Sequence, residues 1–117
     1  MKIGMIADLL HADVLCGEEF LDNEVHSACG ADMMSDVLAF VKDQAVLITG
    51  LVNPQVVRTA EMMDMRCIVF VRGKMPADDI VELARESGIV ILATMERMYQ
   101  ACGILYENGL YHGGEVR

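Results

Sequence analysis

The sequence predicts an α/β domain with three layers and a mainly parallel sheet. Three short apolar runs, rich in β-branched residues, lie at 45–49, 67–71 and 89–93. Such runs are typical of strands buried on both faces. A helical pattern follows each run, and alternating strands and helices form a parallel sheet with crossover connections. The carboxyl ends of these strands then share one edge, where α/β proteins usually hold ligands.

The first 44 residues predict an N-terminal helix and short strands. Apolar residues fall on one helical face over 2–10, and the runs 13–16 and 25–29 read as short strands that glycines terminate. Apolar residues recur at helical spacing over 32–41, which predicts a second helix.

Helix boundaries are better marked in the second half of the chain. Asn53 is a good N-cap for the helix after the first buried strand. Pro76 is expected to open the next helix, with Gly88 as its C-cap, because these residue types favour those positions. Thr94 is expected to cap the last helix, which should end near 108–109.

Length and composition indicate one domain over residues 1–110, with a polar tail over 111–117 that we expect to be frayed. No apolar run approaches the roughly 20 residues of a membrane span. The N-terminus lacks a signal-peptide pattern, so the cytoplasm is the expected compartment. A net charge of −9 argues against nucleic acid and anionic membranes as partners.

Cysteine and methionine usage points to packing rather than chemistry. The cysteines show no C-x-x-C pair and no histidine at metal-ligand spacing, so we expect structural thiols, no metal and no cofactor. They are Cys16, Cys29, Cys67 and Cys102. Ten methionines fill the core or form an adaptable binding surface. This apolar surplus predicts a homodimer.

Two loops at the predicted carboxyl edge are candidates for anion binding. In the first, Thr49, Gly50 and Asn53 lead into a helix, and we expect the N–H groups after Gly50 to face solvent and favour negative charge. No Walker A or G-x-G-x-x-G pattern is present, and a plain capped helix is the alternative. The second loop places Arg72, Gly73 and Lys74 after the next strand.

Arg72 or Lys74 should come within reach of Gly50 if the two strands are neighbours, although a solvated turn explains the same residues. The acids Asp32 and Asp36 lie four apart on the predicted helix 32–41. Such a pair can bind a cation or act in acid–base chemistry, but more often it solvates a helix start. We see no catalytic set.

Several of these segments resemble the DRTGG-domain family. That family is similar to the N-terminal domain of HPr kinase/phosphorylase. The matching segments are Val14–Gly17, Ser35–Leu38, Ile48–Gln55, Ile68–Pro76, Ile91–Thr94 and Ala101–Leu105. The Asp-Arg-Thr-Gly-Gly run itself is absent. The resemblance implies a non-catalytic regulatory or dimerisation module, and free-standing copies resemble proteins encoded near iron-only hydrogenases of anaerobes.

Three functional hypotheses follow. The first is a cytoplasmic regulatory module that self-associates and senses a nucleotide or small anionic metabolite at the Gly50–Gly73 edge. The second is a small enzyme that acts on a phosphorylated or acidic metabolite there, with Asp36 as candidate base. The third is a structural partner in a redox or hydrogenase system. A ligand at about 100 times its Kd adds roughly 2.7 kcal/mol of stability, so a thermal-shift ligand screen is the simplest experiment to discriminate among these hypotheses.

Overall fold

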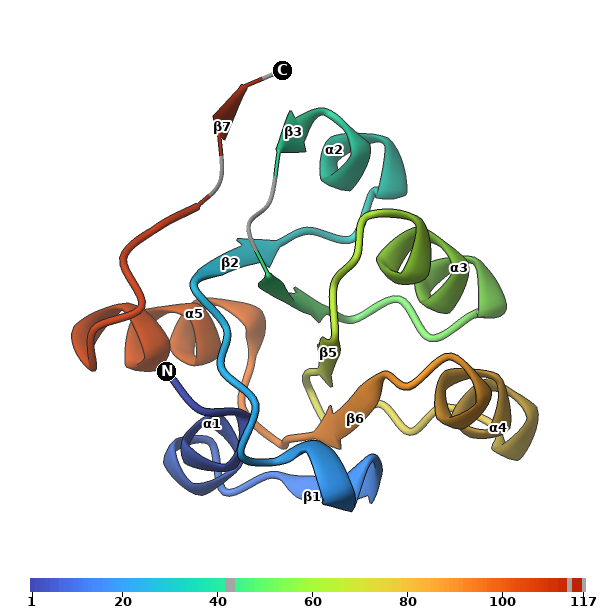
Figure 1. Cartoon of the computed structure of the whole chain (residues 1–117). Coiled ribbons are helices and arrows are strands. Elements are labelled where there is room, and N and C mark those ends of the chain that lie inside the picture. Colours follow the sequence, from blue (N-terminus) through green and yellow to red (C-terminus); the bar gives the residue numbers. More distant parts are fainter. Residues whose placement is uncertain (42–43, 114, 117) are drawn as a thin grey trace.

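A mixed sheet runs through the centre of the molecule, with helices on both faces (Figure 1). This computed structural model describes residues 1–41, 44–113 and 115–116. In chain order the elements are α1 (Ile3–Leu9), β1 (Asp13–Cys16), the 3-10 turn η1 (Glu18–Phe20), β2 (Ser27–Gly30), α2 (Met34–Leu38), β3 (Phe40–Val41), β4 (Ala45–Thr49), α3 (Pro54–Met62), β5 (Cys67–Phe70), α4 (Asp78–Glu86), β6 (Val90–Ala93), α5 (Met98–Glu107) and β7 (Glu115–Val116).

The main sheet has the strand order β1-β6-β5-β4-β2. The three strands predicted from the apolar runs are neighbours within it and run parallel, as expected. The prediction of a mainly parallel sheet is wrong in one respect: the sheet is mixed, because β1 runs antiparallel to β6. The Thr94 hydroxyl donates to the Leu10 carbonyl at 2.7 Å. This bond joins the segment before β1 to the carboxyl end of β6, next to the Asp13–Ala93 pair with which the antiparallel pairing begins.

Side chains of the parallel strands alternate between two hydrophobic clusters, one on each face. Val46 and Ile48 of β4 pack with residues of α1 and α5. Leu47, between them, packs with residues of α2, α3 and α4 on the other face. All five residues of β4 are buried, which explains why this strand reads as a continuous apolar run. Figure 1 shows the two helical layers on opposite sides of the sheet.

Two of the predicted helix boundaries are confirmed and two are wrong. The Asn53 side chain caps α3 by accepting from the Val56 N–H at 3.2 Å, and Gly88 follows α4 with φ +70°. The helix predicted at Pro76 begins at Asp78, and Pro76 is buried in the preceding loop. Thr94 caps no helix, because its hydroxyl closes the turn at the end of β6, and α5 begins at Met98.

The helix predicted over 32–41 is shorter in the structure, and described residues of the tail pair with other segments. α2 ends at Leu38, and β3 pairs antiparallel with β7, with Phe40 opposite Val116. Strand pairing with a distant segment thus replaces the last helical turn. The tail also approaches β2, where the His112 carbonyl accepts from the Ala28 N–H at 2.8 Å. Residues 42–43, which directly follow the predicted helix in sequence, lie outside the described residues.

The second short strand begins two residues later than predicted, at Ser27, and ends at Gly30. Within the described ranges, no helix has the length and apolar character needed to cross a membrane.

Candidate functional site

The ends of four parallel strands form the candidate site. At this edge β2 leads into Asp32, β4 into Gly50, β5 into Arg72 and β6 into Thr94. Backbone hydrogen bonds join the loops: the Arg72 N–H donates to the Glu96 carbonyl at 2.8 Å, and the Gly73 N–H donates to the Thr94 carbonyl at 3.0 Å. The site therefore rests on a connected set of turns.

An internal carboxylate occupies the Thr49–Gly50 turn. The Asp32 Oδ1 atom accepts from the Gly50 N–H at 2.8 Å and from the Thr49 hydroxyl at 3.2 Å. The Thr49 oxygen in turn accepts from the Leu51 N–H at 3.1 Å. The N–H groups of Gly50 and Leu51 therefore bond to these two side chains rather than facing solvent, as we had expected of the N–H groups after Gly50. The turn does attract negative charge, and Asp32 supplies it.

The Arg72 guanidinium lies directly over Gly50. A Cβ at position 50 would collide with the guanidinium and approach its Cζ and Nε atoms to 3.1 Å, so only glycine fits here without movement. Arg72 is exposed and has φ +61°, and Gly73 follows with φ +69°. The two ion pairs within the described ranges are Arg66–Asp64 and Arg85–Glu82. The donors of Arg72 are therefore not committed to a described carboxylate.

The remaining predicted site residues lie apart from this contact. Asn53 uses its side chain to cap α3. Gly73 lies against Met95, because a Cβ there would sit 2.9 Å from the Met95 sulfur. Lys74 is exposed, and its ammonium group makes no ion pair with any residue that the structure describes. The structure thus brings together Thr49, Gly50 and Arg72.

Asp32 and Asp36 are not on one helix face, because α2 begins at Met34 and Asp32 precedes it. Asp36 lies in the first turn of α2, as a helix-start acid does. Sequence reasoning missed the role of Asp32, since it depends on β2 lying beside β4. The available signal was the position of Asp32 three residues after the strand predicted over 25–29, on the same sheet edge as Gly50.

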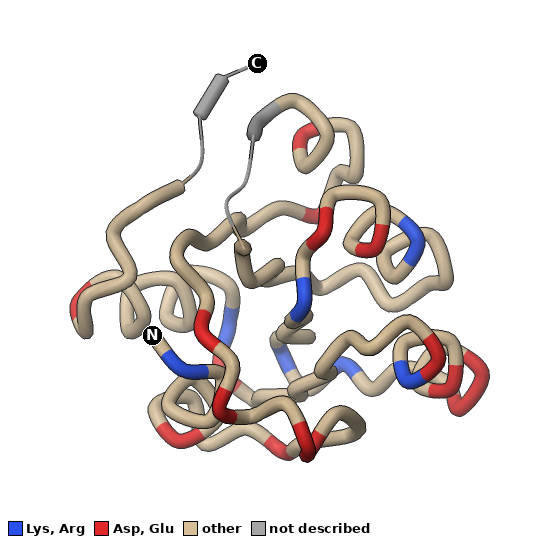
Figure 2. The backbone as a smooth tube through the Cα atoms, viewed as in Figure 1, with Lys and Arg blue, Asp and Glu red and all other residues tan. Residues whose placement is uncertain are grey.

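Charge and thiol chemistry offer no second site in the described part of the chain. Lys and Arg are scattered among acidic residues over many elements (Figure 2). No group of three or more His, Cys, Asp or Glu residues among those described could hold a metal ion. None of the four cysteines forms a disulfide. Burial raises the pKa of the Cys67 thiol, so it stays protonated and acts as a small apolar side chain.

The Cys16 and Cys102 thiols also have raised pKa values, chiefly because burial disfavours the thiolate. A nucleophilic or metal-binding cysteine needs a lowered pKa. These two thiols therefore fit packing roles better than chemistry.

Comparison with known proteins identifies the chain. Among curated protein sequences, none matches it. A solved structure of similar fold contains the CBS and DRTGG domains of the regulatory region of Clostridium perfringens pyrophosphatase, complexed with its activator diadenosine tetraphosphate. The likeness has a TM-score of 0.71 at 19% identity, and it covers 89% of this chain but 45% of the other. The DRTGG domain profile matches residues 5–107, and the chain therefore belongs to the DRTGG-domain family.

Proposed function

We propose that this chain is a non-catalytic regulatory module of the cytoplasm that senses an anionic metabolite at the Arg72–Gly50 contact. The observation that carries the proposal is the Arg72 guanidinium, which lies exposed over the Thr49–Gly50 turn without a described ion pair. Guanidinium groups bind phosphate through paired N–H donors, and such charge-assisted bonds are stronger than neutral ones. Lys74, two residues on, adds a second positive charge to the same loop.

A nucleotide is the anion class that suits this edge. Exposed methionines project from the loops after β2, β5 and β6, at Met33, Met75 and Met95. Methionine packs adaptably against flat rings, and Met95 lies against Gly73, the residue after Arg72. In the pyrophosphatase regulatory region of similar fold the bound activator is also a nucleotide, which makes nucleotides the first ligands to test.

Asp32 provides a means of response. Its carboxylate takes the position that a ligand phosphate would take at the Gly50 N–H. A phosphate that binds Arg72 repels this carboxylate and competes for the same donor. Asp32 lies two residues before α2, so its release changes how α2 and the paired strands β3 and β7 are held.

Titration calorimetry of the full chain with ADP and with diadenosine tetraphosphate tests the proposal. Arg72→Ala should weaken binding by about 1.5–3 kcal/mol, the range for a hydrogen bond to a charged group. Arg58→Ala is the matched control, because Arg58 is exposed on α3 and its removal changes the net charge equally. The proposal fails if neither nucleotide produces heat, or if both variants bind like the wild type.

The partner expectations belong to the same proposal. We expect a homodimer, as the apolar surplus of the sequence predicts. Two further expectations rest on the family resemblance. One is the similarity to the N-terminal domain of HPr kinase/phosphorylase, and the other is a protein partner in a redox or hydrogenase system. Affinity purification from an anaerobic lysate tests the partner, with the Arg72→Ala chain as the comparison.

A further inference from the structure

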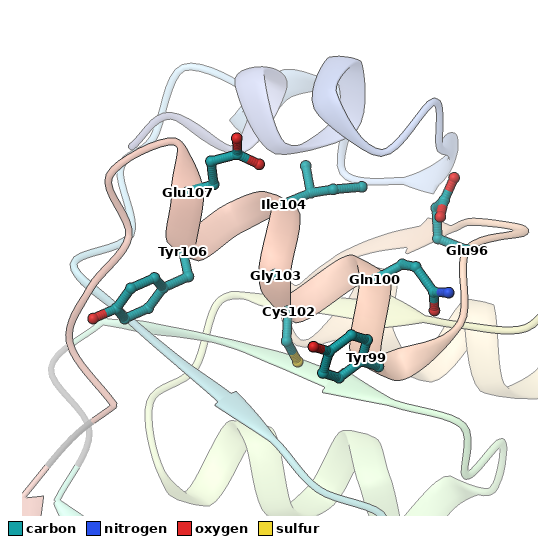
Figure 3. Close-up of a pocket in the computed structure, with 8 residues that line it drawn as sticks. All are labelled: Glu96, Tyr99, Gln100, Cys102, Gly103, Ile104, Tyr106 and Glu107. Atoms are coloured by element: carbon teal, nitrogen blue, oxygen red, sulfur yellow. The ribbon is translucent and has the colours of Figure 1, made fainter.

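The outer face of α5 carries an unusual set of exposed residues. All three tyrosines of the chain lie on α5 or just after it: Tyr99 is 86% exposed, Tyr106 60% and Tyr111 65%. Between the first two lies Gly103, where a Cβ would meet no described atom within 4 Å. Tyr99, Gly103 and Tyr106 are spaced i, i+4, i+7 and share one helical face. A hollow of about 570 Å³ runs along this helix (Figure 3).

Within the described ranges, no hydrogen bond or ring contact involves the Tyr99 side chain, and Gly103 lies in open space. Glycine inside a helix is destabilising relative to alanine, and the space at Gly103 would accept a larger residue. Large exposed aromatic side chains are typical of interfaces. Tyr106 is also held in place, because its ring packs edge-on against Tyr111 with centroids 5.1 Å apart. The face is therefore preorganised without being covered.

We propose that this face of α5 is the homodimer interface, with α5 of a second copy packed antiparallel across Gly103. This inference rests on the self-association proposed above and names its surface. Gly103 at the centre lets the two helix backbones approach closely. A two-fold axis beside Gly103 then sets Tyr99 of each copy against Tyr106 of the other, so that one patch is complementary to itself.

The dipole of α5 favours the antiparallel direction for a second copy. The N-terminus of α5 has no side-chain cap, because Arg97 makes no capping hydrogen bond. Its free N–H groups carry partial positive charge. Glu107 ends the same helix, so antiparallel pairing places each Glu107 at the uncapped N-terminus of the other copy. Parallel pairing would set like ends together.

The area is of the right order for a specific contact. Burying Tyr99 and Tyr106 of both copies would remove roughly 600 Å² from solvent, at about 200 Å² for a whole tyrosine. That is more than half of the ~1,000 Å² that a biological interface needs. Gln100, Ile104 and Glu107 line the same hollow and extend the contact.

Sedimentation velocity of the full chain from 5 to 200 μM tests the interface. The wild type should sediment as a dimer, and Tyr99→Ser and Gly103→Leu should each raise the dimer Kd at least tenfold with unchanged circular dichroism. Gly103→Cys should form a covalent dimer under mild oxidation, because cysteines at a two-fold centre come within disulfide reach. Met62→Cys, 74% exposed on α3, is the control and should cross-link no faster than the wild type.

The outcomes distinguish a failure of the proposed self-association from a failure of the proposed α5 surface. A monomeric wild type at 200 μM overturns both the self-association and its surface. A dimer that survives Tyr99→Ser and Gly103→Leu overturns the α5 surface alone, as does equal cross-linking of Gly103→Cys and Met62→Cys. None of these results touches the anion site, because the calorimetry of the Tyr99→Ser chain measures that site independently.

Discussion

Removing the Asp32 carboxylate should lower the stability of the fold and raise its affinity for an anion. Asp32 accepts two hydrogen bonds from the Thr49–Gly50 turn, at 2.8 and 3.2 Å. Hydrogen bonds to a charged group contribute about 1.5–3 kcal/mol, and exposure to solvent reduces this. Asp32 is exposed, so we expect Asp32→Ala to cost about 1–2 kcal/mol of unfolding free energy in urea titrations.

The affinity should move in the opposite direction. Asp32→Ala frees the Gly50 N–H and removes a negative charge from beside the bound phosphate. A charge about 4 Å away in a water-like environment opposes an anion by about 1 kcal/mol, and the freed donor adds a similar amount. ADP should therefore bind about 5 to 30 times more tightly in calorimetry at low salt.

Asp36→Ala is the matched control for this variant. It removes the same charge four residues later, in the first turn of α2, and Asp36 makes no side-chain contact with the turn at Gly50. Its ADP affinity should stay near that of the wild type. The reasoning is refuted if Asp32→Ala loses stability and affinity together, since Asp32 would then support the ligand rather than compete with it.

Three further predictions concern the backbone and the core. Gly17→Ala should lower the unfolding free energy by about 2–4 kcal/mol in urea titrations, because Gly17 has φ +86° and a Cβ would lie 2.9 Å from the Val90 Cα. Arg72→Gly should leave stability unchanged or raise it by up to about 1 kcal/mol, because Arg72 has φ +61°, and it should weaken ADP binding as much as Arg72→Ala does. Burial raises the pKa of the Cys67 thiol, so its stabilising contribution is complete below about pH 8.5 and is lost at higher pH; Cys67→Ala should reduce that loss by about 1.4 kcal/mol per pH unit in denaturation at pH 8 to 10.

The buried strands could be predicted from sequence because their surroundings are uniform. β4 matches its prediction residue for residue, since a strand covered on both faces needs an unbroken apolar run. The start of α5 could not be predicted in this way. Thr94 resembles an N-cap, but its hydroxyl bonds to the Leu10 carbonyl, 84 residues away in sequence. A local pattern carries no information about a partner at that separation.

The candidate site could likewise be predicted only in part. The approach of the β5 loop to Gly50 follows from parallel pairing of β4 and β5, which the sequence predicts. The arrival of Asp32 depends on β2 taking the outer place beside β4, and no short-range signal specifies strand order. Sequence reasoning therefore predicted the approach of Arg72 to Gly50 and missed the Asp32 carboxylate that bonds to the Gly50 N–H.

The left-handed backbone conformation of Arg72 bears on how this site is built. Arginine has no preference for the left-handed region, where residues other than glycine are strained by about 1–2 kcal/mol. Two hydrogen bonds to the β6–α5 loop, from the Arg72 and Gly73 N–H groups, hold the turn in this conformation and send the side chain back over Gly50. A turn that served structure alone would be better built with glycine or asparagine at this position. The backbone strain at Arg72 has a reason if its guanidinium binds a ligand. The negative charge of Asp32 then sets how strongly that ligand must bind to replace the carboxylate at the Gly50 N–H.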